Sequence, residues 1–460
     1  MGNESPWHSK WTNVAVKYQW LAGRRAFYVH QLHQEFGPAV RLGPTEVDFS
    51  DIDAVKTIYS VKTEFPKSTW YQRMVPYESA SVFSTSDIEF HRRHRRLLSA
   101  PLSVSSLKLI EPILHRRTVQ AMDKMADEIK SRGVTDVFKW ALFYSTDVVG
   151  ELTFGESFRM LDMGKVNQYI LNLQSNAKLN GLRSTFPSLV TAGKYVPLPL
   201  FRRAAQATRQ MRSYAQQSMQ RYRRLISADP STRPTLFSRL FKAGEHGLSD
   251  EEIIADAQAY IIAGSDTTAV SFTYLVWAVC RRDEVKKTLL QELATLPHDF
   301  SMEHLNDLSY LNQVIDEALR VYGALPAALP RIVPTGGANL AGYWIPGGTT
   351  VTAQAYTMHR NPSVYPRPET FDPSRWATTT KAMKDSFMPF GLGSRICLGI
   401  HLARMELRLA TALFFLRFPN AKISAREGMT DDDMSEVIYF LLGPKGRRCL
   451  VEPEQEQEGY

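Results

Sequence analysis

The segment Phe390-Gly391-Leu392-Gly393-Ser394-Arg395-Ile396-Cys397-Leu398-Gly399 decides the fold of this chain. Its glycines allow tight turns and the close approach of a flat ligand, and its apolar residues exclude water. An amphipathic stretch follows Leu398, so we expect Cys397 at a helix N-terminus, where the helix dipole and nearby Arg395 favour a thiolate. A lone cysteine in a glycine-rich turn is more often a buried structural residue. The surrounding pattern favours a chemical role for this one.

The same segment resembles the haem-binding signature of the cytochrome P450 family, Phe-x-x-Gly-x-Arg/His-x-Cys-x-Gly. The resemblance extends over about residues 20–451, because the other motifs of the family follow in the expected order. It implies haem b as the cofactor and Cys397 as the axial ligand of its iron, since a thiolate ligand promotes oxygen activation. The residues of this segment that we expect to contact the cofactor are Phe390, Gly391, Gly393, Arg395 and Gly399.

Helical periodicity dominates a chain of 460 residues, of which 44% are hydrophobic. The ranges with apolar residues at spacings of three and four are 24–36, 105–131, 138–154, 202–226, 248–281, 283–296, 309–321 and 398–417. Short strands are expected at 39–42 with 46–49, at 340–345 with 350–354, and at 436–442. We predict a mainly α protein with small peripheral β-sheets. The resemblance implies a single-domain cytochrome P450 fold with haem between helix 248–281 and the Cys397 loop and helix.

The chain contains no internal repeat and no Gly/Ser linker, so we expect one domain over 21–460, and the resemblance implies that it is a haem-thiolate monooxygenase domain. Residues 1–20 are interpreted as an N-terminal segment that follows a missing or absent membrane anchor. Two helix starts are marked by capping boxes, at Ser86–Glu89 and at Ser249–Glu252. The second predicted helix is about thirty residues long, and small and β-branched residues weaken its middle.

Glu317 and Arg320 are three residues apart on one face of a predicted helix. Alone, such a pair is an ordinary surface ion pair of about 0.2–0.5 kcal/mol. The two residues resemble the Glu-x-x-Arg pair of the family, and Phe371–Trp376 resembles the later segment whose arginine, here Arg375, completes a buried triad. The resemblance implies a structural role for Glu317, Arg320 and Arg375 beneath the Cys397 loop.

His91 and Arg95 are four residues apart on the helix that begins near Ser86, so both side chains are expected to point at one anion. The resemblance implies that this anion is a haem propionate, and it places Arg331 and Arg395 where further propionate partners are expected. No further metal ligands accompany His91 and His94, so we assign no second metal.

The middle of the long predicted helix reads Ala263-Gly264-Ser265-Asp266-Thr267-Thr268 and matches the family motif Ala/Gly-Gly-x-Asp/Glu-Thr-Thr/Ser. From the residues alone, it is a small-residue patch against which something packs closely, and a threonine there can simply bond to the carbonyl four residues earlier. The resemblance implies that Asp266 and Thr267 are the catalytic acid and alcohol that bind water and deliver protons. It also implies that Ala263 and Gly264 leave room for substrate.

The implied reaction inserts one oxygen atom of dioxygen into a lipophilic substrate, while the other atom leaves as water. The run Val321–Arg331 departs from the common double-proline version of the family and is similar to fungal microsomal members that oxidise polyketides, terpenoids or alkaloids. The residues expected to line the substrate pocket are Phe83, Ala263, Gly264, Ala327, Ala328, Leu329 and Phe440.

Two alternative functions stay open. A haem-thiolate enzyme that couples rings, rearranges its substrate or uses peroxide would keep Cys397, although such enzymes often lose the acid and alcohol pair. A non-catalytic electron carrier or sensor usually fills both axial positions, whereas this sequence has one ligand motif.

Partners follow from what the chain lacks and from its charge. It has no flavin or nicotinamide fingerprint, so electrons are expected from NADPH through a separate flavoprotein, an NADPH-cytochrome reductase. The net charge of +8 is spread over separate arginine clusters, which argues against nucleic acid as a partner. The three cysteines are too few and too scattered for a disulfide framework. We expect a monomer on the cytosolic face of the endoplasmic reticulum membrane, with the anchor absent from this sequence.

Overall fold

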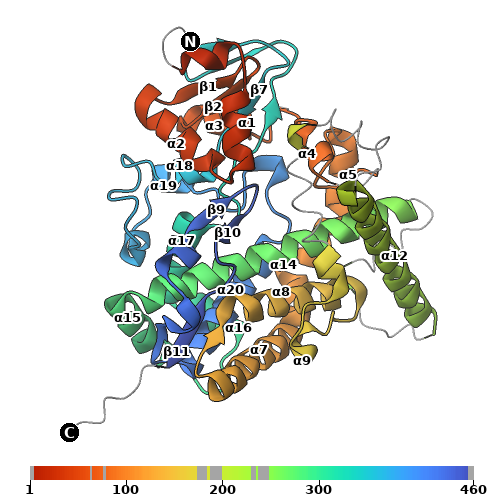
Figure 1. Ribbon diagram of the computed structural model, residues 1–460, viewed down its shortest axis with the longest axis vertical. Coiled ribbons are helices and arrows are strands. Elements are labelled where there is room, and N and C mark those ends of the chain that lie inside the picture. The colour runs from red at the N-terminus through yellow and green to blue at the C-terminus, as the bar shows by residue number, and fades with distance from the viewer. Residues whose placement is uncertain are drawn as a thin grey trace.

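The structure is a computed structural model, and it describes residues 5–62, 65–75, 79–172, 184–186, 199–228, 235–236 and 248–453. The described part is mainly helical and carries small sheets at its periphery, as the sequence predicts (Figure 1). Residues 1–4 of the predicted N-terminal segment lie outside the described residues.

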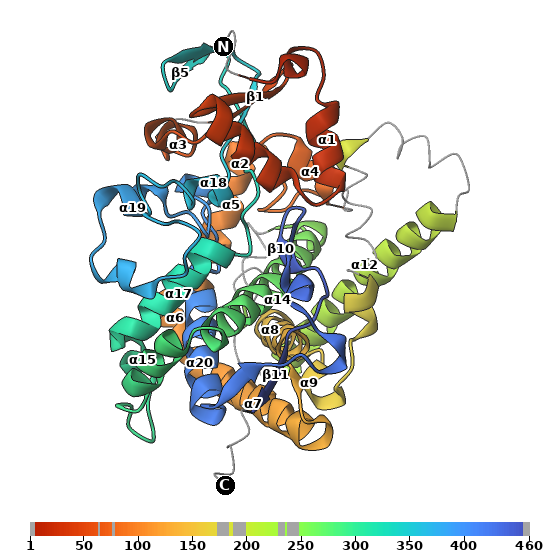
Figure 2. The ribbon, with the colours of Figure 1, turned by 60° about the vertical axis from the view of Figure 1, so that its left-hand side comes forward.

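Helix α14 (Asp250–Cys280) runs through the middle of the molecule (Figure 2). It begins with the predicted capping box of Ser249 and Glu252. It packs against α8 (Val137–Phe154), α17 (Ser309–Tyr322) and α20 (Ile400–Arg417). A buried hydrogen bond of 3.0 Å from the Thr268 hydroxyl to Glu406 joins α14 to α20, and burial raises the pKa of Glu406 to about 8.

The other α-helices surround this centre, and those at 25–36, 104–107, 111–132, 199–228 and 283–293 fall on predicted ranges. They are α1 (Val14–Leu21), α2 (Arg25–Phe36), α3 (Ile52–Ile58), α4 (Trp70–Met74), α5 (Ile88–Ser99), α6 (Val104–Leu107), α7 (Glu111–Arg132), α9 (Met160–Met163), α12 (Pro199–Ala228), α15 (Asp283–Leu293), α16 (Met302–Asp307), α18 (Ala355–Met358) and α19 (Lys381–Ser386). Range 105–131 is divided between α6 and α7, with a short 3-10 helix between them.

The start of α5 differs from the prediction. Its N-cap is Asp87, whose carboxylate accepts the Phe90 N–H at 3.0 Å. The hydroxyl of Ser86 instead accepts from the Gln72 side chain at 3.1 Å, so the predicted Ser86–Glu89 capping box is not formed and the N-cap lies one residue later. Both Ser and Asp are good N-caps, and the local pattern alone does not choose between neighbours.

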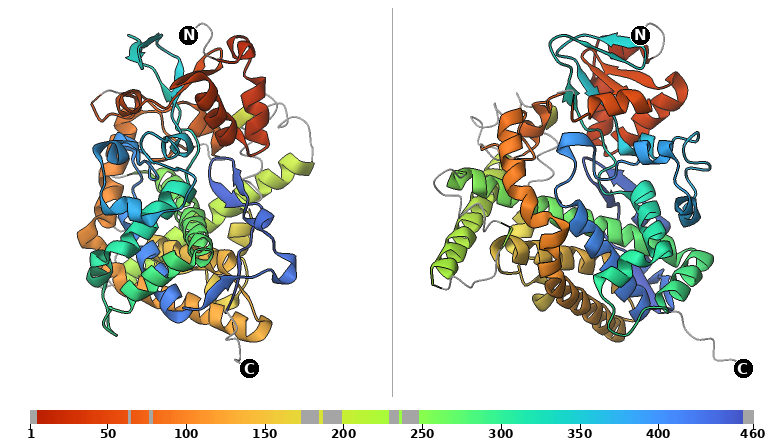
Figure 3. Two further views of the ribbon diagram at one scale, coloured as in Figure 1. Left: turned by 90° about the vertical axis from the view of Figure 1, so that its left-hand side faces the viewer. Right: turned by 180° about the vertical axis from the view of Figure 1, so that it is seen from behind.

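The largest sheet lies at the N-terminal end of the molecule, with strand order β1-β2-β7-β4 (Figures 1 and 3). As predicted, β1 (Ala39–Gly43) pairs antiparallel with β2 (Glu46–Phe49). The next strand, β7 (Thr350–Thr352), pairs parallel with β2 and antiparallel with β4 (Arg331–Ile332). The sequence analysis predicted that this strand pairs with 340–345, and that prediction is wrong.

Residues 340–345 are not one strand. A turn at Ala341 and Gly342, both with positive φ, separates β5 (Ala338–Leu340) from β6 (Tyr343–Ile345), and these two strands pair with each other. The predicted strand 436–442 is likewise the beginning of a hairpin, β9 (Glu436–Ile438) with β10 (Leu442–Pro444). The remaining sheet contains β3 (Thr135–Asp136), β11 (Leu450–Pro453) and β8 (Ala421–Ile423).

Among the described helices, no single one is both long enough and apolar enough to cross a membrane. The pair Ile88–Leu102 and Val104–Arg132, bent by 44°, satisfies those criteria only when the two helices are taken together.

Candidate functional site

The Cys397 loop is held by its backbone at the entrance to α20. The N–H of Cys397 donates to the Phe390 carbonyl at 2.9 Å, and α20 begins three residues later at Ile400. Gly391 and Gly393 both have positive φ. A Cβ on Gly393 would lie 1.6 Å from the carbonyl oxygen of Tyr59, so only glycine fits this turn. The glycines therefore shape the loop as the sequence predicts.

The side chain of Cys397 is exposed, in contrast to the buried Cys280 and Cys449. Its surface is accessible, although enough protein surrounds it for burial to raise its pKa. The backbone N–H of Gly399 and the positive charge of Arg95 act in the opposite direction and favour the thiolate. Arg395, which we expected to do this, instead donates to the Thr85 carbonyl at 3.3 Å. Arg95 also donates to the Ile396 carbonyl at 2.7 Å and so supports the loop from α5.

A group of basic side chains gathers beside this loop. His91, Arg331 and Arg395, three of the predicted propionate partners, influence one another electrostatically. Burial, and then the charges of Arg395, Lys67, Arg95 and Arg331, lower the pKa of His91 to about 3. Burial and the Arg331 charge lower the pKa of Arg395 to about 10.

Lys67 belongs to this group, and the sequence analysis missed it. Its side chain is buried, and burial together with Arg331 and Arg395 lowers its pKa far below the usual value. The backbone places it there, because Lys67 forms a β-bridge with Arg331 across 264 residues of chain. No local pattern around Lys67 signals this contact.

The donor set fits the two carboxylates of haem. Among the described residues, no carboxylate forms an ion pair with Lys67, Arg95, Arg331 or Arg395. Buried cations normally have an anionic partner, because the cost of removing them from water is high. A group with two carboxylates would pair with these basic side chains and offset the repulsion between their positive charges. The thiol of Cys397 offers a soft ligand for iron.

The motif on α14 places its residues on different sides of the helix. Ala263 is exposed, although α14 lies in the core of the molecule. The Thr267 hydroxyl donates to the Ala263 carbonyl at 2.5 Å, which is the back-bonded arrangement of a mid-helix threonine. Burial raises the pKa of Asp266, and Arg447 opposes this shift.

Gly264 does not line an open space for substrate, although the sequence analysis expected this. A Cβ on this residue would lie 2.9 Å from Cγ2 of Val149 on α8, so the Cα of Gly264 faces that helix. Its small size allows α14 and α8 to approach closely. We therefore correct the expectation that Gly264 leaves room for substrate.

The structure brings Glu317, Arg320 and Arg375 together. Arg320 and Glu317 form a buried, bidentate pair with two hydrogen bonds of 2.8 Å, and Arg375 donates to the same carboxylate at 3.0 Å. The indole of Trp376 donates to Glu317 at 2.9 Å, a contact that the sequence analysis missed. His359 is also involved, because Arg320 donates to its carbonyl at 2.9 Å.

Of the predicted pocket residues, Phe83 and Phe440 belong to one aromatic cluster, with ring centroids 5.9 Å apart. Trp70 and Tyr71 on α4 complete this cluster. Ala327, Ala328 and Leu329 are buried on the path into β4, and Leu329 also packs near Gly391 of the Cys397 loop.

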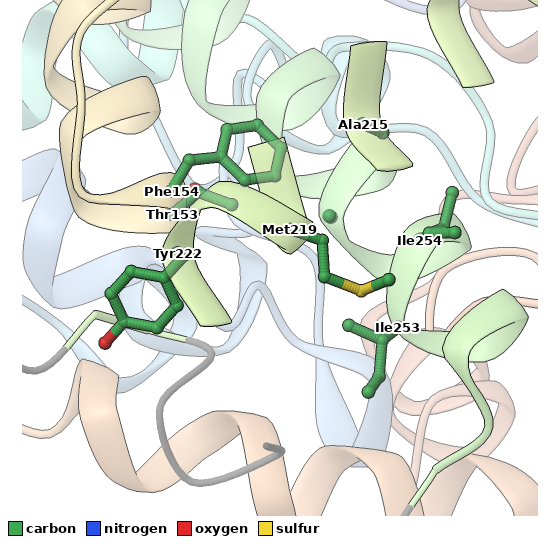
Figure 4. A pocket seen from close by; sticks show the side chains of 8 residues that line it. Thr153, Phe154, Ala215, Met219, Tyr222, Ile253 and Ile254 are labelled. Atoms are coloured by element: carbon green, nitrogen blue, oxygen red, sulfur yellow. The ribbon is translucent and has the colours of Figure 1, made fainter. Parts of the chain in front are cut away.

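A small apolar cavity of about 10 Å³ lies elsewhere, between α8, α12 and α14 (Figure 4). Thr153, Phe154, Met219 and Ile253 are among its lining residues. It is only large enough for about one water molecule, and none of the residues discussed above lines it. It is a packing defect and not the functional site.

An accessible thiol on a glycine-rich loop lies beside basic side chains that, in the part of the chain that the structure describes, form no ion pair with a carboxylate, and this combination is typical of a haem-thiolate protein. The chain belongs to the Cytochrome P450 family, whose family model matches residues 6–450. It is therefore a haem-dependent monooxygenase, like the relatives to which it is similar.

Three relatives show how far this similarity extends. The chain is 46% identical over 448 residues to the cytochrome P450 monooxygenase tazI of Aspergillus terreus, covering 96% of this chain and 92% of that protein. It is 44% identical over 449 residues to the cytochrome P450 monooxygenase orf2 of Aspergillus niger, covering 97% and 92%. It is 34% identical over 458 residues to the cytochrome P450 monooxygenase stcB of Emericella nidulans, covering 97% and 87%.

Proposed function

We propose that this monooxygenase oxidises a lipophilic secondary metabolite, such as a polyketide, terpenoid or alkaloid, with haem b bound between α14 and the Cys397 loop. The observation that carries the proposal is the accessible Cys397 thiol beside the buried Lys67 and Arg331 and the half-buried Arg395. The similarity to fungal monooxygenases supports the substrate class.

Each part of the site has a distinct role in this proposal. Haem, when bound, supplies the oxygen–oxygen cleavage that a thiolate ligand favours. His91, Arg331, Arg395 and Lys67 hold its propionates, and Lys67 adds one cation to the predicted set. Arg95 stabilises the Cys397 thiolate and fixes the loop through the Ile396 carbonyl.

Thr267 and Asp266 deliver protons in this proposal. The Thr267 hydroxyl donates its hydrogen to the Ala263 carbonyl, which leaves its oxygen lone pairs to accept a hydrogen bond from water. Burial raises the pKa of Asp266, which favours the protonated form of its carboxyl, the form that can donate a proton. The positive charge of the exposed Arg447 opposes this shift and favours the ionised carboxylate.

Replacing Thr267 tests this proton role. Thr267→Ala removes the hydroxyl and little volume, so NADPH consumption through the reductase should continue while product per NADPH falls and hydrogen peroxide rises. The measurement is the ratio of product to NADPH, together with the peroxide released. Thr267→Ser, the matched control, keeps the hydroxyl and should stay close to wild type. A Thr267→Ala variant that remains tightly coupled would leave Thr267 as a back-bonded helix residue only.

A separate flavoprotein reductase supplies the electrons in this proposal. Arg96 of α5 is exposed and offers a positive charge to an acidic partner, whereas the exposed Arg92 pairs with Glu89. Arg93 of the same helix pairs with Glu252 of α14 at 2.8 Å. NADPH oxidation that proceeds at the same rate without any reductase would contradict this part of the proposal.

A membrane surface is the proposed location, on the cytosolic face of the endoplasmic reticulum. Large apolar side chains stand exposed along the first helices, with Trp7 78% and Trp11 80% exposed, followed by Val14 and Tyr18. Tryptophan and tyrosine favour the boundary between lipid and water. The double variant Trp7→Ala/Trp11→Ala should sediment less with phosphatidylcholine vesicles than wild type, and equal sedimentation would oppose the proposal.

The second candidate is a haem-thiolate enzyme that couples rings, rearranges its substrate or uses peroxide. The intact Asp266 and Thr267 favour the monooxygenase. An electron carrier is less well supported, because the exposed residue at the centre of α14 is Ala263, which cannot ligate iron. Product formation with hydrogen peroxide at the rate obtained with NADPH and reductase would favour the second candidate.

A further inference from the structure

The short segment Ser81–Thr85, between α4 and α5, is buried except for the partly accessible Phe83. The segment is closed on itself, because the N–H of Ser81 donates to the Ser84 hydroxyl at 3.0 Å and the N–H of Ser84 donates to the Ser81 hydroxyl at 3.2 Å. Such a turn fixes its own shape but not its place in the protein. Its place is set by charged side chains from distant parts of the chain.

Asp256 of α14 holds one side of this segment. Its carboxylate accepts the N–H of Val82 at 2.7 Å and lies 2.7 Å from Nδ1 of His94 on α5, and both side chains are fully buried. Burial raises the pKa of Asp256, while the hydrogen bond with His94 opposes that shift. Asp256 therefore joins the segment, α5 and α14 at one point. None of the roles assigned above uses it.

Two cations hold the other side. The ammonium group of Lys67 donates to the Phe83 carbonyl, and Arg395 donates to the Thr85 carbonyl at 3.3 Å. The Val82–Phe83 stretch is thus held at its N–H by a carboxylate and at its C=O by an ammonium. Charge-assisted hydrogen bonds of this kind are about twice as strong as neutral ones.

The side chain fixed in this way is Phe83. Its ring stands 5.6 Å from that of Tyr71 and 5.9 Å from that of Phe440, and the Lys67 ammonium lies 4.5 Å from its centroid. Lys67 is also one of the cations proposed to hold the haem propionates. Phe83 therefore stands at the edge of the proposed haem site.

We infer that Asp256 is a positioning residue for ligand binding, which holds Val82 and thereby sets the Phe83 ring against the ligand at the haem site. The inference rests on the haem site proposed above. It assigns to Asp256 an influence on ligand selection without direct contact with the ligand.

The test compares two iron ligands that differ in size, imidazole and 4-phenylimidazole, by spectral titration of the haem-loaded protein. The phenyl group should reach Phe83, whereas imidazole needs only the iron. Asp256→Ala should weaken 4-phenylimidazole by about tenfold, which corresponds to the loss of one buried contact, and should change imidazole less than twofold. Phe83→Ala should have the same selective effect.

The double variant Asp256→Ala/Phe83→Ala decides whether Asp256 acts through Phe83. If it does, Asp256→Ala has no further effect once Phe83 is removed. Fully additive losses, or an equal loss for both ligands in Asp256→Ala, would overturn the inference. Asp256→Asn should retain wild-type selectivity, because its amide can still accept from Val82 while donating to His94.

Glu252→Gln is the matched control. It lies one turn away on α14, contacts His94 and Arg93 but not the Ser81–Thr85 segment, and should leave both affinities unchanged. If Asp256→Ala does not fold, Asp256→Glu, which keeps the charge but is one methylene longer, should show the same selective loss. Unchanged selectivity in that variant would overturn the inference.

Amide hydrogen exchange separates this inference from the haem proposal. The Val82 N–H should exchange faster in Asp256→Ala than in wild type, whether or not haem is bound, and an unchanged rate would overturn the inference. A reduced carbon monoxide complex without the band of thiolate-ligated haem would refute the haem site alone.

Discussion

At the scale of single residues, Arg320 shows how the fold changes the meaning of a short motif. Besides its two bonds to Glu317, it donates to the carbonyls of His359 at 2.9 Å, Pro368 at 2.7 Å and Thr370 at 3.1 Å. Its guanidinium therefore fixes the polypeptide beneath the Cys397 loop at several points. A lysine has three donors on one atom and cannot reproduce this fork.

Arg320→Lys should consequently lower the free energy of unfolding by about 3 kcal/mol, because it leaves a buried carboxylate incompletely paired. Urea denaturation monitored by circular dichroism measures this loss. Arg367→Lys is the control, since the Arg367 side chain is 76% exposed and its distance to Asp372 is 3.8 Å. Its loss should stay below about 0.5 kcal/mol. Similar losses in both variants would contradict the role given to Arg320.

The residues that could be predicted are those that belong to motifs. The pairing of Glu317 with Arg320 and Arg375, and the setting of Cys397, follow from short stretches with recognisable spacing. Lys67 could not be found in this way, because its contact with Arg331 joins segments far apart in the chain.

Asp256 and His94 escaped prediction for the same reason, and His94 was considered only as a metal ligand. Its actual partners are the carboxylates of Asp256 and Glu252, contributed by another helix. Among the described residues, no group of three or more potential ligands could hold a metal ion.

At the scale of elements, helix centres were predictable and their first residues were less so. The apolar period places α8, α14, α17 and α20 correctly, because their buried faces repeat over many turns. The start of α5 depends on a single hydrogen bond. Ser86 bonds to the Gln72 side chain, and Asp87 therefore accepts the Phe90 N–H as the N-cap. The strand pairing of β7 depends on contacts with β2, about 300 residues earlier, which the local alternation does not encode.

The two neighbours at the start of α5 give a direct test. Asp87→Ala should lower the free energy of unfolding by about 1 kcal/mol, because it removes the acceptor of the Phe90 N–H. Ser86→Ala should cost less than about 0.5 kcal/mol, because its hydroxyl binds an exposed glutamine side chain. Chemical denaturation of the two variants and wild type measures both values. A larger loss for Ser86→Ala would restore the capping box expected from the sequence.

At the scale of the whole molecule, α14 and the Cys397 loop are connected to a buried polar frame, which is formed by Glu317, Arg320 and His359. The stability that this frame provides depends on pH. His359 belongs to this frame: its Nδ1–H donates to the Arg320 carbonyl at 2.9 Å, and its Nε2 accepts the N–H of Met388 at 2.9 Å. This arrangement requires the neutral ring, and burial lowers the pKa of His359 to about 3.

The sign of the pH effect follows from that shift. The unfolded chain binds a proton at His359 below about pH 6.5, whereas the folded protein does not bind it until about pH 3, so the folded state loses stability as the pH falls. Between pH 7 and pH 5 the loss is about 2 kcal/mol for this one group. His359→Gln cannot titrate, so the difference in unfolding free energy between it and wild type should shrink by that amount. A difference that stays constant with pH would contradict the neutral, buried His359.

The ligation of haem iron by Cys397 is the central claim for the molecule as a whole, and the spectrum of the reduced protein with carbon monoxide tests it most directly. Wild type should show the red-shifted Soret band of thiolate-ligated haem. Cys397→His should lose that band, whereas Cys280→Ala, a change at a buried cysteine of α14, should keep it. A folded wild-type protein whose band is that of a histidine-ligated globin, or a Cys397→His variant that keeps the thiolate band, would contradict the account.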